Sequence, residues 1–313
     1  MIKRITAAAK VLVPLVVAFF IGRVIYGNWQ QVREAEWAFA PVYIFLSVVV
    51  TAFWFVVRPW VWKLILAQFG YSLPYGAAYG IFRRAELSRF VPGSIWHYVS
   101  RVYLAGQWGV PATACLAATL TETVILLLAA IVPALWSLHQ ALPFLAAPQR
   151  VLLLVVPFVA LGLMHPKVLN FGGRFLARRL KQPYVELRVG WARLAGIWLL
   201  YVMIWVTHGL SAGLFVRGIL EVPVSLIPML GSSYILAWLI GMVSLIAPAG
   251  MGVRDGAFGL LLRGVMPLGA ALTVAVAVRL WSVSIELLYT MGVGRFIHSP
   301  APGASEAASG NRL

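Results

Sequence analysis

The sequence predicts an all-α polytopic membrane protein with about six full spans and two re-entrant helical hairpins, arranged as inverted repeats. Of its 313 residues, 62% are hydrophobic and 11% are charged, whereas a soluble domain has about 45–50% and about 25%. Apolar runs such as 41–66 and 111–138 exceed the roughly 20 residues that cross a bilayer core. Two stretches that contain charged residues, proline and glycine interrupt this apolar pattern, and the same spacing between prolines occurs at both.

The composition also excludes several classes of function. The formal net charge is +16. In a membrane protein, Lys and Arg gather in cytoplasmic loops and beside anionic headgroups, and we favour this reading over a nucleic-acid partner. The single cysteine, Cys115, allows no disulfide within the chain, and the five histidines show no metal-binding spacing. We therefore expect no metal, no cofactor and no nucleic acid.

The spans are predicted from the apolar runs in order. The N-terminus has a basic start, an apolar stretch and no small-x-small cleavage site, so we expect an uncleaved first span and not a signal peptide. Because the bilayer core offers the backbone no water, every span must be a helix. The expected spans are about 11–27, 41–66, 111–138, 150–164, 192–217 and 267–294.

The distribution of positive charge predicts the orientation. Segment 165–193 carries seven Lys or Arg residues against one acid, Glu186, so we expect a cytoplasmic loop. Counting spans from this loop places both termini in the cytoplasm, and the basic N-terminus agrees. We expect a multi-pass protein of the bacterial cytoplasmic (inner) membrane. The tail 298–313 is small and polar, and we expect it to be disordered.

Two weak internal repeats are predicted from proline spacing. Pro92 and Pro111 lie 19 positions apart, and so do Pro248 and Pro267. Each half would hold three spans and a broken region, and an odd number of spans turns the second half upside down. The predicted transmembrane domain is 1–297, with halves of about 1–140 and 146–297.

The first broken region predicts a re-entrant hairpin with arms 75–90 and 94–107. Four charges in the first arm disfavour a lipid-exposed span, because each costs roughly 2.5–3.5 kcal/mol at a helix centre; they are Arg83, Arg84, Glu86 and Arg89. Pro92 and Gly93 provide the break, since proline removes a donor and glycine permits the turn. The positive end of the second arm then suits an anion.

The second broken region, 244–258, predicts a matching tip. Its breaks and first charges are Pro248, Gly250, Gly252, Arg254 and Asp255. The glycines resemble a nucleotide-binding loop, but no βαβ context surrounds them, so we exclude that reading.

Several candidate binding residues keep two interpretations. Arg83 and Arg84 are either cytoplasmic loop charges or part of a polar path, whereas for Arg89 and Arg101 a binding site is favoured. The pair Trp96 and His97 belongs either to an interfacial aromatic belt or to a ligand site. Glu122 lies within an apolar span, where acids are functional candidates, yet it would also serve to pair an arginine. Arg279 and Glu286 are equally consistent with structural and functional roles.

Four stretches carry a family resemblance: "RFVPGSIWHYVSRVYL", "TLTETVILLL", "APAGMGVRDGAF" and "AVAVRLWSVSIELL". Over about 10–297 the chain resembles the flippase-like membrane proteins that share the transmembrane region of lysylphosphatidylglycerol synthases. The resemblance implies functional roles for Pro92, Gly93, Arg101, Glu122, Pro248, Gly250, Gly252, Arg254 and Arg279. The chain departs from the family pattern at Asp255, where glutamate is commoner, and at the Trp96–His97 pair.

This resemblance implies lipid translocation without the synthase reaction, because we expect no aminoacyl-transfer domain after residue 297. The expected substrate is a membrane lipid with an anionic or polyprenyl-linked headgroup, and we expect no enzyme activity. An accessory subunit of cell-envelope glycolipid assembly, with envelope-biosynthesis proteins as partners, remains an alternative. A membrane glycosyltransferase is disfavoured, because such enzymes need paired carboxylates or a metal-binding Asp motif and this chain has one Asp.

Overall fold

The computed structural model describes residues 19, 23, 26–27, 29–35, 37–88, 95–137, 147–180, 183–243 and 252–291. The regular elements in these residues are helices. Beside them there is one isolated antiparallel bridge, between Trp37 and Leu220. The shortest elements are α2 (Trp29–Glu34) and the 3₁₀ turns η3 (Val224–Leu226) and η5 (Leu262–Gly264).

Four long helices correspond to predicted spans: α3 (Pro41–Ala67), α6 (Ala112–Ala134), α9 (Trp191–Ile219) and α12 (Leu268–Met291). All four are long and apolar enough to cross a membrane, as is the stretch Val224–Met242. The predicted span 150–164 falls in α7 (Ala147–Leu163), and most of the predicted span 11–27 lies outside the described residues.

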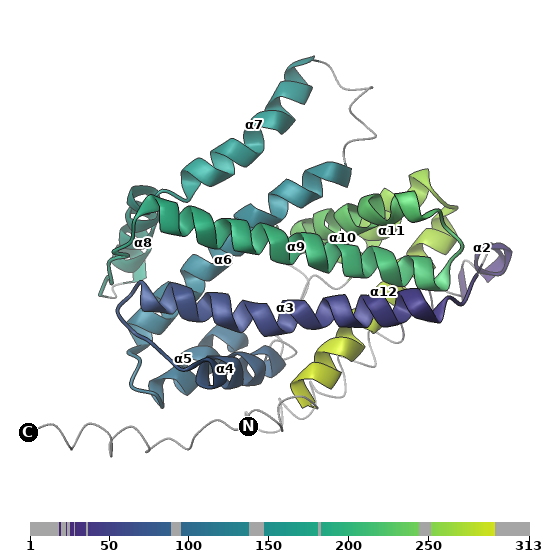
Figure 1. The fold of residues 1–313 in the computed structure, drawn as a ribbon. Helices are drawn as coiled ribbons and strands as arrows, with labels where there is room; N and C mark the ends of the chain where they lie inside the picture. The colour runs from purple at the N-terminus through teal and green to yellow at the C-terminus, as the bar shows by residue number, and fades with distance from the viewer. Residues whose placement is uncertain are drawn as a thin grey trace, which may run out of the picture.

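Helices α3 and α9 pack side by side in opposite directions (Figure 1). At the start of α3, Ala40 N donates to Gly218 O at 2.9 Å, near the end of α9. Gly218 allows this approach, because a Cβ there would lie 2.6 Å from Ile44 Cγ1. Trp62, Tyr201 and Trp205 are fully buried in the core beside α6.

Two pairs of shorter helices follow the long ones. Helices α4 (Tyr75–Leu87) and α5 (Trp96–Gly106) pack together after the C-terminal end of α3. Helices α10 (Ile227–Val243) and α11 (Val253–Leu261) pack together after the C-terminal end of α9. Because α3 and α9 are antiparallel, the two pairs begin at opposite ends of the molecule (Figure 1).

The predicted arms 75–90 and 94–107 match α4 and α5 closely, but the second pair is less symmetrical than expected. With 17 residues α10 is roughly 26 Å long, close to a full crossing, whereas α4 with 13 residues is roughly 20 Å. Adding 156 positions, the separation of Pro92 from Pro248, to the bounds of α4, α5 and α6 nevertheless brings them close to the bounds of α10, α11 and α12. The helix order of the first half therefore recurs in the second.

Segment 165–193, predicted as a loop, contains a helix. Helix α8 (Pro166–Leu180) follows α7 after a bend of 65°, and an extended stretch from residue 183 to 190 leads into α9. The charge count predicts a cytoplasmic side for this segment but gives no conformation, because a basic amphipathic helix and a basic loop contain the same residues.

Candidate functional site

Two arginines and two glutamates meet in the interior at the first short-helix pair. They come from four helices: Arg58 from α3, Glu86 from α4, Arg101 from α5 and Glu122 from α6. Their exposed fractions are 8%, 5%, 1% and 2%. We call these four residues the buried charge cluster.

Glu122 is the centre of the cluster. Its Oε1 accepts a hydrogen bond from Arg58 Nη2 at 3.1 Å, and its Oε2 accepts one from Arg101 Nη1. The hydroxyl of Tyr201, on α9, donates to the same Oε1 at 2.9 Å. Glu86 lies farther away, with its Oε1 at 3.6 Å from Arg101 Nη2 and 3.9 Å from Arg58 Nη1. One carboxylate thus holds both guanidinium groups while the second stands beside them.

Aromatic rings surround the two guanidinium groups. The ring of Phe82 faces both, with its centroid 4.9 Å from Arg58 Cζ and 4.1 Å from Arg101 Cζ. Trp54 faces Arg58 and Trp62 faces Arg101. Cation–π attraction is strongest away from water, so these rings replace part of the lost hydration.

The cluster is electrically neutral but incompletely bonded. The Nε atoms of Arg58 and Arg101 are buried and make no hydrogen bond within the described part of the chain. Replacing a buried ion pair by apolar residues is often neutral or stabilising, so packing alone does not explain such a cluster. Its chemistry suits an exchange in which another oxyanion takes the guanidinium donors that Glu122 now occupies.

The model of the lysylphosphatidylglycerol synthase TM region family matches residues 8–288. The chain belongs to this family. The match includes all four residues of the buried charge cluster and both short-helix pairs. No curated protein and no solved structure matches the chain.

Among the residues that the family resemblance singled out, the structure brings Arg101 and Glu122 into direct contact. Sequence reasoning did not select Arg58, Glu86 or Tyr201 as site residues. Arg58 carried a usable signal, since an ionisable residue inside an apolar span is a functional candidate. Tyr201 carried none, because a tyrosine in an apolar helix is more often a packing residue.

A second polar group lies at the α10–α11 pair. The guanidinium of Arg254 faces the ring of Tyr234 at 4.6 Å, and Tyr234 Oη lies 3.3 Å from His208 Nε2. The His208 ring stacks on Trp54 with centroids 4.2 Å apart, and Trp54 faces Arg58. A continuous row of rings therefore connects the buried charge cluster to the second pair.

Asp255 makes a local contact. Its Oδ2 accepts a hydrogen bond from Gly252 N at 3.2 Å, which caps the start of α11. Gly252 has φ +82°, a conformation that side chains other than glycine rarely adopt. The contact of Asp255 is thus with the start of its own helix.

The remaining predicted site residues are dispersed. Trp96 and His97 form the first turn of α5, where the His97 ring lies 3.9 Å from that of Tyr98. Arg279 and Glu286 lie on α12, with Glu286 buried. The other predicted positions fall outside the described residues: Arg89, Pro92, Gly93, Pro248 and Gly250.

Proposed function

We propose that the chain is a flippase-like transporter that moves an anionic or polyprenyl-linked lipid across the bacterial cytoplasmic membrane, without enzyme activity. The observation that carries this proposal is the buried charge cluster, in a chain that belongs to the lysylphosphatidylglycerol synthase TM region family. Ionisable groups inside a membrane protein are costly, and they commonly mark the path of a polar substrate.

The proposed site works by competition. A lipid phosphate and a carboxylate use the same guanidinium donors, and arginine binds both in a fixed geometry. In the structure Glu122 occupies the donors of Arg58 and Arg101. An arriving headgroup displaces Glu122 from these donors, and the two arginines hold the headgroup for as long as the lipid is bound. Tyr201 then offers the freed carboxylate a remaining hydrogen bond.

The proposal includes inverted repeats and two re-entrant hairpins. Supporting observations are the antiparallel packing of α3 and α9 and the recurring helix order, which an inverted repeat requires. The α4–α5 and α10–α11 pairs would enter from opposite faces, since they begin at opposite ends of α3 and α9. Arg254, of which Nη2 is buried without a hydrogen bond among the described residues, would receive the headgroup from the other side.

The decisive experiment is a transport assay with purified protein in proteoliposomes that contain fluorescent phosphatidylglycerol. Removing Arg101 alone leaves Glu122 short of a partner in a dry site, which typically costs about 3–5 kcal/mol. We therefore pair Arg101→Gln with Glu122→Gln, which keeps the cluster neutral. The double variant should retain the wild-type fold and lose transport.

An exposed arginine provides the matched control. Arg263 is exposed on η5, and Arg263→Gln should transport like the wild type. If the Arg101→Gln/Glu122→Gln variant is folded and transports at the wild-type rate, the cluster is structural and the proposal fails. If the wild-type protein alone moves no lipid, the accessory-subunit alternative gains support.

A further inference from the structure

Helix α8 has an apolar stripe on its exposed side. Val168, Phe171 and Phe175 are 43%, 75% and 57% exposed. Positions 168, 171 and 175 fall on one face of a helix, within roughly 60° of each other. Exposure of such a stripe to water is unfavourable, so this face is suited to an apolar medium.

Cations border the stripe on both sides. Lys167, Arg174 and Arg178 lie along one edge and Arg179 along the other, and the helix contains no acid. Arg179 Cζ lies 5.6 Å from the centroid of Phe175. An apolar aromatic stripe between basic edges is typical of a helix that lies in the headgroup layer of an anionic bilayer. The 65° bend after α7 turns α8 away from the direction of that helix.

The extended stretch after α8 is fixed to it. Asn170 Oδ1 accepts hydrogen bonds from the Tyr184 hydroxyl and from Leu187 N, while Asn170 Nδ2 donates to Leu187 O. Partial burial raises the pKa of the Tyr184 phenol, which keeps it a neutral donor. Gly173 makes room for its ring, because a Cβ there would lie 2.8 Å from Tyr184 Cε2.

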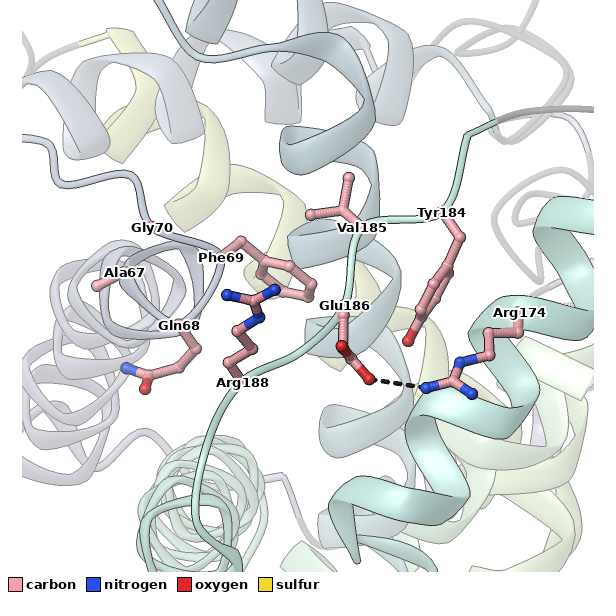
Figure 2. Close-up of a pocket in the computed structure, with 9 residues that line it drawn as sticks. All are labelled: Ala67, Gln68, Phe69, Gly70, Arg174, Tyr184, Val185, Glu186 and Arg188. Atoms are coloured by element: carbon pink, nitrogen blue, oxygen red, sulfur yellow. Dashed lines mark hydrogen bonds and ion pairs between the residues drawn. The ribbon is translucent and has the colours of Figure 1, made fainter.

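A cavity of about 800 Å³ lies between this stretch, α8 and the C-terminal end of α3 at 67–70 (Figure 2). Arg174 and Arg188 contribute positive charge to its wall and Glu186 negative charge. Arg174 Nη2 is paired with Glu186 Oε1 at 2.7 Å. Arg188 forms no ion pair among the described residues, and Figure 2 shows its guanidinium extending toward the Phe69 side of the cavity.

We propose that this cavity binds the headgroup of an anionic phospholipid while α8 lies in the headgroup layer beside it. The surplus of cations matches the net charge of such a lipid, the Arg188 guanidinium its phosphate, and the adjoining apolar stripe its acyl chains. The site is separate from the buried charge cluster and goes beyond the proposed transport function. The cavity lies where the chain passes from α3 to the first short-helix pair. It would therefore concentrate anionic lipid beside that pair.

The binding test is native mass spectrometry of the purified full-length chain with phosphatidylglycerol or phosphatidylcholine at equal concentration. We expect preferential retention of phosphatidylglycerol. Arg188→Gln should weaken its binding about fivefold, and Arg174→Gln/Arg188→Gln about 25-fold, if each arginine near a lipid headgroup contributes as surface cations do. Arg193→Gln removes the same charge from the nearby first turn of α9, outside the cavity, and should change binding less than twofold.

Equal retention of the two lipids, or an Arg193→Gln effect as large as that of Arg188→Gln, would overturn the proposed site. A spin label at position 171, in a Phe171→Cys/Cys115→Ser protein in nanodiscs, tests the placement of α8. We expect a depth of roughly 5–10 Å below the headgroups, and a fully aqueous label would contradict this placement. The comparison of Arg188→Gln with Arg193→Gln and the depth of position 171 concern this site alone, so their failure leaves the proposed function untouched.

Discussion

Glu122 illustrates what a single residue does in this molecule. One carboxylate receives hydrogen bonds from two arginines and a tyrosine, and these donors come from α3, α5 and α9. A carboxylate buried to 2% exposure tolerates its charge only with such partners. The same bonds connect four helices, so the cluster joins the first short-helix pair to the long helices.

Tyr201→Phe is the mildest test of this arrangement. The substitution removes one hydroxyl without opening a large cavity, so Glu122 loses one neutral donor and keeps both arginines. We expect a loss of about 1–2 kcal/mol in stability, since hydrogen bonds inside membrane proteins are modest but this acceptor is charged. Thermal unfolding in detergent measures the loss, and Tyr103→Phe, which changes an exposed ring, should show none.

Sequence reasoning identified part of this site. Glu122 was selected as an acid inside an apolar span and Arg101 as a cation beside the predicted break, and they proved to be partners. Their contact was not predictable, because it depends on how α5 folds back against α6. Arg58 was passed over as a charge within a long span, and Glu86 was counted only as one reason against a span. Whether two charged residues pair depends on their positions in three dimensions, which a hydropathy pattern does not give.

At the scale of helices, Pro59 removes one backbone hydrogen bond of α3, and a residue of a distant helix replaces it. Proline has no N–H, so the carbonyl of Phe55 four residues earlier lacks its helical donor. The hydroxyl of Tyr289, on α12, donates to that oxygen at 2.6 Å. Their rings also stack, with centroids 4.4 Å apart. The carbonyl acceptor that Pro59 leaves open in α3 is thereby satisfied by a side chain of α12.

A double-mutant cycle tests this compensation. Tyr289→Phe alone should destabilise the protein by about 1–3 kcal/mol, because it leaves a partly buried carbonyl without a donor. In a Pro59→Ala background the residue at 59 supplies its own N–H, so the same change should cost less than half as much. Equal costs in the two backgrounds, measured by thermal unfolding, would show that the hydroxyl does not serve this carbonyl.

Helices α9 and α10 meet backbone to backbone. A Cβ on Gly231 would lie 2.4 Å from Gly209 O, so no larger residue fits without moving a helix. Gly231→Ala should therefore separate the two helices and lower the unfolding temperature by several degrees. Gly196→Ala, in α9 with open space around it, should be neutral or slightly stabilising. Similar values for both variants would mean that close packing here is unimportant.

Hydropathy and charge predicted the helices unevenly. Spans 41–66, 111–138, 192–217 and 267–294 were predicted well, because lipid selects long apolar helices regardless of tertiary contacts. Helix α8 was missed as a helix, since its many charges were read only as a sign of the cytoplasmic side. The length of α10 was missed because its composition fits both a crossing helix and a buried arm.

For the whole molecule, the charge distribution predicts a topology that cysteine labelling in intact cells can measure. The native Cys115 is buried and should react little. A cysteine placed at 140–149 should react with an impermeant reagent from outside, and one at 170–182 should not, because the seven basic residues of 165–193 predict a cytoplasmic segment. External labelling at 170–182 would reverse the proposed orientation.

Two further positions distinguish a hairpin from a complete crossing by α10. If α10 and α11 return to the face from which they came, Glu221→Cys and Arg263→Cys should both react from outside. If α10 crosses and α11 does not return, only Glu221→Cys should react. The second result would remove the re-entrant hairpin from the proposal, and with it the symmetry that supports inverted repeats.

Arg58 also has a consequence for biogenesis. It precedes Glu122 by 64 positions, so α3 enters the bilayer before its strongest partner has been synthesised. The isolated helix must then bear roughly 2.5–3.5 kcal/mol for the arginine, against about 0.3–0.6 kcal/mol gained from each Val, Leu, Ile or Phe. The 27-residue length and dense apolar content of α3 meet that demand. Shortening this apolar stretch would impair insertion by the translocon even where the finished ion pair could still form.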